Sequence, residues 1–373
     1  MPQVVARVPR SWRLLLVAVV CFIVAPPAHM AAQQGQPGQL QFHPVRGNIY
    51  MLQGAGANIT VSIGRDGVLM VDSGLQSVGD QVLAAIRRLQ NQLDLRDAPI
   101  SGGAETRSTV ADRHIERPAK PIRYIINTHV HPDHVGGNEL LRRAGMTFTG
   151  GNVTGNISDA TEGAAIMAHE AVLTRMTSTA NGATPAPADA QPTDTYYTDT
   201  MKLSHFFNGE GVQLIHQPAA HTDGDTFVWF RGSDVIAAGD LFSTTTYPVI
   251  DIKQGGTIDG IVEGLNRILR LCIAEFRTEG GTLVVPGHGR LSDSADVAYY
   301  RDMVTILRDR VRAMVAKGLT LEQVKAAKPT ADYEPRYGAT SGPWTTDQFI
   351  EAAYVSLGGG KAVAPRTAPG RSK

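Results

Sequence analysis

The sequence predicts an α+β fold in which two mixed β-sheets pack face to face, with helices on their outer faces. Two observations lead to this prediction. The first predicted strands follow one another as hairpins, whereas the later strands alternate with helices. With 373 residues and 42% hydrophobic content, the chain is long enough to bury a core of this size.

The N-terminus is typical of a secretory signal peptide. Arg7, Arg10 and Arg13 precede an apolar run over 14–25, which is too short to span a bilayer comfortably. We expect the signal peptide to cover residues 1–32, so that the protein is exported to the periplasm or secreted. No stable membrane anchor is then expected after cleavage. An uncleaved N-terminal anchor is the alternative.

Changes in composition divide the rest of the chain. Residues 33–41 are rich in Gln, Gly and Pro, which predicts a flexible lead-in. The main folded domain is predicted over 42–291, and a C-terminal helical extension over 292–357. The last segment, 358–373, combines Gly, Pro and basic residues and is predicted to be a disordered tail.

Hairpin signals open the main domain. Asp66-Gly67 lies between two β-rich runs and predicts a tight turn. Apolar residues then recur at helical spacing over 82–93, which predicts a helix, and polar residues over 96–121 predict a surface insertion. Strands in this half are predicted at 48–52, 58–63, 68–71 and 122–126.

Helices and strands alternate in the second half. Helices are predicted over 139–144 and 160–176, followed by a mobile loop over 177–195. A long amphipathic helix is predicted over 293–317, and Thr320 is the expected N-cap of a further helix. Strands are predicted at 212–216, 226–231, 234–238 and 282–285.

The expected partner is a small-molecule substrate. Lys and Arg number 35, as do Asp and Glu, and no basic stripe is evident, so no nucleic-acid partner is expected.

After cleavage Cys272 would be the only cysteine, which excludes an internal disulfide. Its apolar surroundings predict a buried helical thiol. The oligomeric state is left open.

Candidate metal ligands follow the predicted strand at 122–126. His129 and His131 project to one side of an extended or tightly turning loop, and Asp133 and His134 can face a second position close by. Imidazole and carboxylate groups are ligands that suit zinc and related divalent ions. The spacing therefore predicts a metal site.

Three more candidate ligands follow other β-rich runs. His221 lies in a turn between two predicted strands, Asp240 ends another, and His288 follows the strand at 282–285. Loops at the rim of a rigid sheet commonly carry functional residues, so these side chains can converge with the first cluster.

The run from His129 to His134 resembles the His-x-His-x-Asp-His signature of the metallo-β-lactamase superfamily, and the resemblance extends from about Phe42 to Leu291. It implies an αβ/βα four-layer sandwich with the site at the sheet edges. It also implies two Zn²⁺ ions per chain, with iron or manganese as alternatives. His129, His131 and His221 would bind the first ion, Asp133, His134 and His288 the second, and Asp240 would bridge them. Asp72 would support the ligands from behind.

The ligand set is closer to glyoxalase II and lactonases than to the cysteine-containing β-lactamases, because Asp240 stands where those enzymes place a cysteine. The resemblance implies hydrolysis of an ester, thioester, lactone or amide bond, β-lactams included, by a metal-bridging hydroxide. Asp133 would orient the hydroxide and pass on its proton. Phe242 and Tyr247 are candidate substrate contacts. A mononuclear iron enzyme similar to the persulfide dioxygenases, and a non-catalytic metal-binding protein, are the alternatives.

Overall fold

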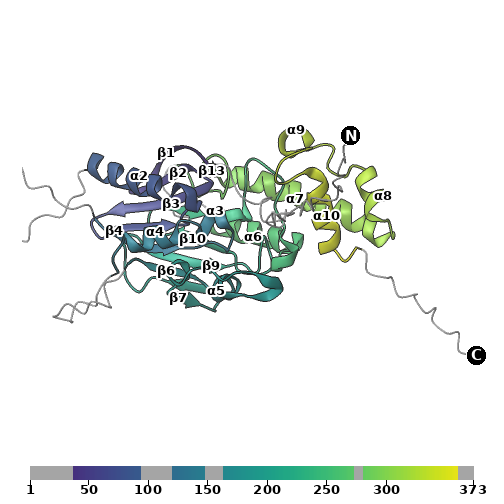
Figure 1. Cartoon of the computed structure of the whole chain (residues 1–373). Coiled ribbons are helices and arrows are strands. Elements are labelled where there is room, and N and C mark those ends of the chain that lie inside the picture. Colours follow the sequence, from purple (N-terminus) through teal and green to yellow (C-terminus); the bar gives the residue numbers. More distant parts are fainter. Residues whose placement is uncertain (1–36, 94–119, 148–162, 273–279, 360–373) are drawn as a thin grey trace, which may run out of the picture.

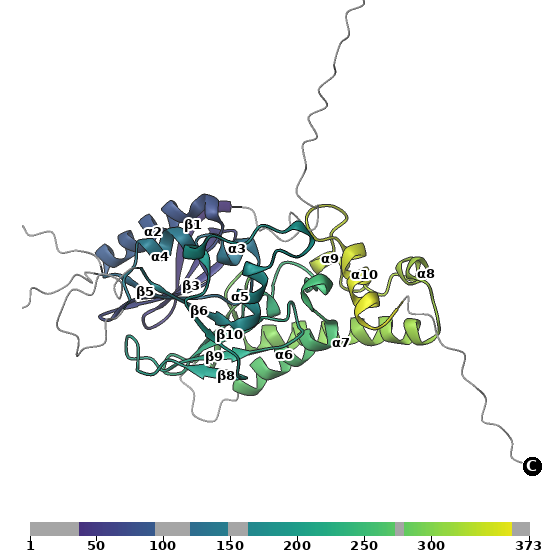
Figure 2. The ribbon, with the colours of Figure 1, turned by 60° about the horizontal axis from the view of Figure 1, so that its bottom comes forward.

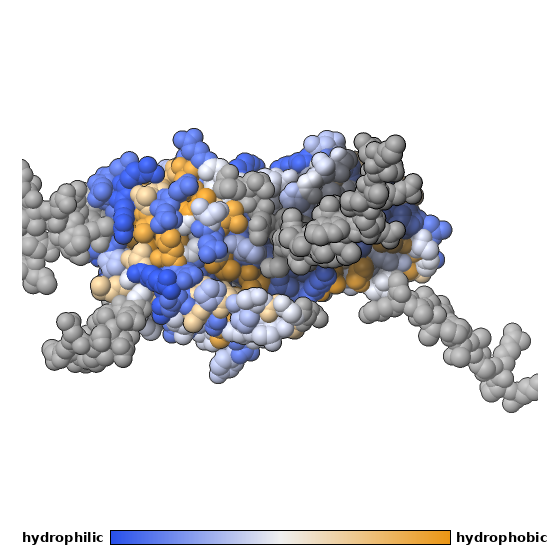
Figure 3. Space-filling view, viewed as in Figure 1, coloured by the Kyte–Doolittle hydropathy of each residue, from blue (hydrophilic) through white to orange (hydrophobic). Residues whose placement is uncertain are grey.

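The computed structural model describes residues 37–93, 120–147, 163–272 and 280–359 (Figure 1). The predicted signal peptide, most of the predicted surface insertion over 96–121 and nearly all of the predicted C-terminal tail lie outside these residues. Among the described helices, none combines the length and the apolar character that crossing a membrane requires. On the face seen in Figure 3, hydrophilic residues surround smaller apolar areas.

Two mixed β-sheets form the centre of the molecule, as the sequence predicts. The first sheet has seven strands in chain order. Its first four strands are antiparallel, as consecutive hairpins require, and its last three run parallel to β4. The strands are β1 (Pro37–Arg46), β2 (Ile49–Ala55), β3 (Ala57–Gly64), β4 (Gly67–Val71), β5 (Ile122–Ile126), β6 (Ala165–His169) and β7 (Asp194–Tyr196).

The second sheet has six strands in the order β13-β12-β11-β10-β9-β8. Only β11 and β12 pair in parallel, because helix α6 (Ile258–Leu271) lies between them in the chain. The strands are β8 (Thr200–Lys202), β9 (Val212–His216), β10 (Thr226–Phe230), β11 (Val235–Ala237), β12 (Leu283–Val285) and β13 (Ser292–Asp293).

Three apolar clusters pack the sheets and helices into layers. One lies between the sheets and joins residues such as Val71 and Ile126 to Leu214 and Val228. The second packs the outer face of the first sheet against α2 (Gly79–Gln92). The third packs the second sheet against α6 and α7 (Ser294–Ala316). The result is a helix–sheet–sheet–helix sandwich, which Figures 1 and 2 show from two directions.

The C-terminal helices extend the third cluster beyond the sheets (Figure 2). Helix α7 begins at the Asp293 N-cap, which confirms the long helix predicted over 293–317. The predicted Thr320 cap is also confirmed, as part of a capping box with Gln323. The other C-terminal helices are α8 (Leu321–Ala326), α9 (Glu334–Tyr337) and α10 (Thr346–Ser356). Two short helices, α3 (Pro132–Val135) and α4 (Asn138–Arg143), follow strand β5 in the first half of the chain.

Two local predictions are wrong. Residues 160–162 of the predicted helix over 160–176 lie outside the described residues. Its described part contains strand β6 and helix α5 (Glu170–Thr177), because every residue of the short apolar run over 165–169 is buried in the parallel part of the sheet. The predicted flexible lead-in is also partly wrong. Residues 37–41 belong to strand β1, which pairs with β2. Backbone pairing thus overrides the polar composition.

Candidate metal centre

All seven predicted donor residues lie together at one edge of the two sheets. They form two groups, in each of which the donor atoms lie within 4.8 Å of one another. Every donor follows a β-strand, either on a loop or in a short helical turn, so the rigid sheets fix where the side chains start. The first group is His129, His131, His221 and Asp240, and the second is Asp133, His134 and His288.

Three imidazole nitrogens converge in the first group. His131 Nδ1 lies 3.1 Å from His129 Nε2 and 2.8 Å from His221 Nε2. Asp240 Oδ2 approaches His221 Nε2 at 3.6 Å. Burial is the main cause that lowers the pKa of His129 well below its ordinary value and the pKa of His221 to about 4. These two rings are therefore neutral near pH 7 and offer lone pairs to a cation.

The second group combines one carboxylate with two imidazoles. Asp133 Oδ2 lies 3.4 Å from His288 Nε2 and 4.0 Å from His134 Nε2. Asp240 Oδ1 lies 3.2 Å from His134 Nε2 and 3.4 Å from His288 Nε2. One oxygen of Asp240 thus faces each group, which is the position of a bridging carboxylate.

The donor set fits a pair of divalent cations. Although they are buried, neither His134 Nε2 nor Asp240 Oδ1 has a hydrogen-bond partner. Burial alone would raise the pKa of Asp240, but His288 and His134 lower it well below its ordinary value. Burial likewise opposes protonation of His134, whereas Asp240 and Asp72 raise its pKa well above the ordinary value. Each ring would release its proton when a cation binds.

Asp72 lies behind the second group, where the resemblance implies it. Its Oδ2 atom lies 2.7 Å from His134 Nδ1 and accepts a hydrogen bond from Thr128 Oγ1 at 2.8 Å, and its Oδ1 accepts from Thr128 N at 2.8 Å. These contacts fix the orientation of the His134 ring. Asp72 adopts a positive φ of 67°, a conformation that few residues other than Gly, Asn and Asp accept.

Sequence reasoning missed three other groups that contact the ligands. Asp251 Oδ2 lies 3.1 Å from His131 Nε2, and the carbonyl oxygen of Val249 lies 2.7 Å from His221 Nδ1. Thr128 Oγ1 lies 3.0 Å from His129 Nδ1. An acid flanked by isoleucines, as Asp251 is, was the one available signal. A backbone carbonyl carries no signal in the sequence.

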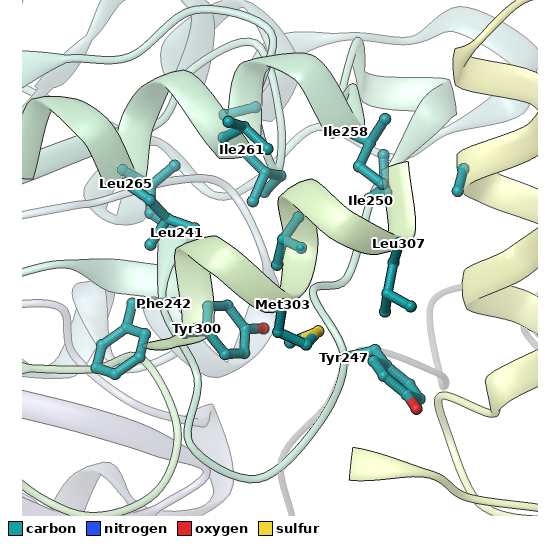
Figure 4. Packing of buried hydrophobic residues seen from close by; sticks show 14 of the residues in the cluster. Leu241, Phe242, Tyr247, Ile250, Ile258, Ile261, Leu265, Tyr300, Met303 and Leu307 are labelled. Carbon is teal, nitrogen blue, oxygen red and sulfur yellow. The ribbon is translucent and has the colours of Figure 1, made fainter. Parts of the chain in front are cut away.

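The expectation that Phe242 and Tyr247 contact substrate is wrong. Both side chains are 1% exposed and lie in the core below the second sheet. Phe242 packs edge-on against Tyr300, and the ring centroids lie 5.3 Å apart. Figure 4 shows the two side chains next to each other. Tyr247 stacks on Phe349 at 4.8 Å. Both aromatic side chains therefore stabilise the contact with the C-terminal helices.

Residues 52–288 match the sequence model described as the metallo-beta-lactamase superfamily, which is more than half of the chain. The chain belongs to the metallo-beta-lactamase superfamily. It is 23% identical over 185 residues to the type 2 metallo-beta-lactamase of Bacillus cereus, covering 50% of this chain and 59% of that protein. A second type 2 enzyme, from Bacillus sp. (strain 170), is 23% identical over 50% of this chain and 58% of its own length. The chain thus spans less than two thirds of these curated relatives.

Solved structures agree on the metallo-beta-lactamase fold. A double mutant of the sec-alkyl sulfatase PisA1 aligns with a TM-score of 0.56 and 15% identity, covering 84% of this chain and 50% of that one. The sec-alkylsulfatase Pisa1 from Pseudomonas sp. aligns with a TM-score of 0.53 and 14% identity, covering 88% and 54%. At this level of identity the likeness shows the fold alone.

The metallo-beta-lactamase-type donor cluster opens to solvent on one side. The side chain of His288 is 25% exposed and that of Asp240 is 9% exposed, whereas Asp133 and His134 are fully buried. Solvent therefore reaches the donor cluster mainly on the side of His288.

A separate histidine pair lies outside the donor groups. His169 stacks on His216 at 3.5 Å between ring centroids and accepts a hydrogen bond from Ala171 N at the start of α5. Burial and the neighbouring His216 lower the pKa of His169 from 6.5 to about 4. Between these pH values the unfolded chain binds a proton at His169 that the folded chain does not.

We therefore expect His169 to make the free energy of unfolding fall as the pH is lowered from 6.5 to 4. The His169→Asn variant removes the titrating ring and keeps an N-cap acceptor for α5. Chemical denaturation of both proteins across this pH range measures the difference. A variant that loses stability on acidification as steeply as the unchanged protein contradicts the assignment.

Proposed function

We propose that this chain is a metal-dependent hydrolase whose seven donor residues hold two divalent ions. The observation that carries the proposal is the position of Asp240, whose Oδ1 faces His134 and His288 while its Oδ2 faces His221. Zinc is the proposed ion, with iron and manganese as alternatives, because imidazole and carboxylate ligands accept all three.

The residues of the chain have distinct roles in the proposed reaction. When bound, the two ions would polarise the bond to be cleaved and lower the pKa of a water molecule at the site. Asp133, whose carboxylate belongs to the second group and lies 3.4 Å from His288 Nε2, would accept the proton that this water releases. Asp72 and Asp251 keep the rings of His134 and His131 in place. No serine or cysteine nucleophile is needed.

The proposed substrate is a small molecule with an ester, thioester, lactone or amide bond, β-lactams included. The relatives are named for β-lactams and secondary alkyl sulfates, so both compounds belong in the set that is tested. We also propose that the protein is exported, because Arg7 to Arg13 and the apolar run over 14–25 have the pattern of a signal peptide. N-terminal sequencing of exported protein tests this point.

Hydrolysis of a small panel by zinc-loaded protein tests the function. The panel contains nitrocefin, a thioester, a lactone, a secondary alkyl sulfate and a phosphodiester. We expect turnover of at least one carbonyl substrate, and loss of that turnover both after chelation and in the His131→Ala variant. Retention of activity in the metal-free protein contradicts the proposal.

The same preparation decides between the proposal and its alternatives. One bound iron, with oxygen consumption when a persulfide is supplied, favours an oxidoreductase. Bound metal without turnover of any panel member favours a metal-binding protein. The position of the Asp240 carboxylate between the groups supports the two-ion hydrolase over these alternatives, because a single iron would leave one of the two donor groups without an ion.

A further inference from the structure

The loop that connects Asp240 to helix α6 forms one wall of the first donor group. We define it as the 243–257 loop. Its Val249 carbonyl oxygen lies 2.7 Å from His221 Nδ1, and Asp251 Oδ2 lies 3.1 Å from His131 Nε2. Asp251 N also donates to the carbonyl oxygen of His221 at 2.9 Å. The loop thus orients two of the three imidazoles in that group.

The opposite side of the 243–257 loop is embedded in the C-terminal helices. Tyr247 stacks on Phe349 of α10 with an angle of 12° between the ring planes, and its hydroxyl donates to the carbonyl oxygen of Thr330 at 3.2 Å. Ile250 is buried in the same cluster, as Figure 4 shows. At the end of the loop, Ile258 N donates to Ser356 Oγ of α10 at 3.0 Å.

The second donor group contacts the 243–257 loop at one point, where Thr244 N donates to the carbonyl oxygen of His288 at 3.1 Å. Its main support lies elsewhere. Asp72, which orients His134, follows strand β4 of the first sheet. The outer face of that sheet packs on α2 through a separate apolar cluster that includes Ile86. A change in α10 is therefore expected to affect the surroundings of His131 and His221 more than those of His134.

We propose that the C-terminal helical extension positions the first donor group. Phe349 of α10 packs on Tyr247 and so keeps the 243–257 loop in position. Val249 and Asp251 of that loop then orient the rings of His221 and His131. Groups that orient metal-binding histidines change metal affinity by about 10- to 100-fold when they are lost. The inference rests on the proposed function only in taking the donor groups as sites for divalent ions.

Titration of the metal-free full-length protein with Co²⁺ tests the inference through binding and not through activity. The absorption spectrum of the ion follows each binding step, and the His131→Ala and His288→Ala variants assign the steps to the two groups. In Phe349→Leu we expect affinity at the first group to fall by about tenfold and affinity at the second group to fall less. Tyr247→Phe keeps the ring and removes only the hydroxyl, so we expect a smaller effect in the same direction.

The matched control is Ile86→Ala, which opens a cavity in the apolar cluster of the first sheet. We expect it to lower thermal stability without weakening the first group selectively. Unchanged Co²⁺ binding in both Phe349→Leu and Tyr247→Phe overturns the inference. An equal loss of affinity at both donor groups in Phe349→Leu and Ile86→Ala also overturns it. Wild-type protein that shows both binding steps but hydrolyses no panel substrate refutes the proposed function and leaves this inference standing.

Discussion

An Asp240→Asn variant is expected to lose one of the two divalent ions and at least about a thousandfold in kcat/KM, equivalent to about 4 kcal/mol of transition-state stabilisation. The substitution keeps the size of the side chain but removes the negative charge shared by the two donor groups. The two carboxylate oxygens of Asp240, which lie 3.2 Å from His134 Nε2 and 3.6 Å from His221 Nε2, are replaced by one carbonyl oxygen and one NH₂ group. An amide is a poor bridging ligand because its nitrogen is a donor.

Elemental analysis and steady-state kinetics of the purified variant measure both effects. Asp259→Asn is the matched control, since Asp259 is an exposed aspartate that forms ion pairs with Arg308 and Arg312 on the surface. We expect the control to stay within about 1 kcal/mol of the original stability and to keep both ions. Asp240→Asn protein with two ions and full activity would be incompatible with a bridging role.

The second large effect is expected for Asp72→Ala, which should lower the free energy of unfolding by about 3–5 kcal/mol. The variant leaves Thr128 N and His134 Nδ1 without their buried acceptor. It also places alanine at a φ of 67°, which costs about 1 kcal/mol or more in addition. The affinity of the second donor group for its ion should also fall, because the His134 ring is no longer oriented.

Asp72→Asn separates the two causes. Asparagine tolerates a positive φ and keeps an oxygen for Thr128 N, so we expect a smaller loss of stability than in the alanine variant. Urea denaturation with and without Zn²⁺ measures both. If both Asp72→Ala and Asp72→Asn are as stable as the unchanged protein and bind metal as it does, the supporting role of Asp72 is excluded.

Much of the fold could be predicted because its signals are local. The turn predicted at Asp66-Gly67 and the Thr320 cap each follow from a few neighbouring residues. The structure has the cap, and it has the turn one residue earlier, at Arg65 and Asp66, with Gly67 already in β4. The seven donors were recognisable because each follows a β-rich run. The edge of the two sheets brings all of them together.

The remaining features depend on tertiary packing. Tyr247 follows Asp240 closely in the chain, which predicted a place at the mouth of the site, yet it turns into the core against Phe349. The apolar run that forms β6 has no periodicity that distinguishes a buried strand from a helix. Asp251 and the Val249 carbonyl are distant from His131 and His221 in the sequence, and only the folded path of the 243–257 loop brings them together.

Metal stoichiometry tests the central claim most directly. The full-length protein is stripped with a chelator, equilibrated with excess Zn²⁺, freed of unbound ion and analysed for metal and protein content. The account predicts two zinc ions per chain, one for each donor group that Asp240 joins. A single ion per chain, or none, would contradict it.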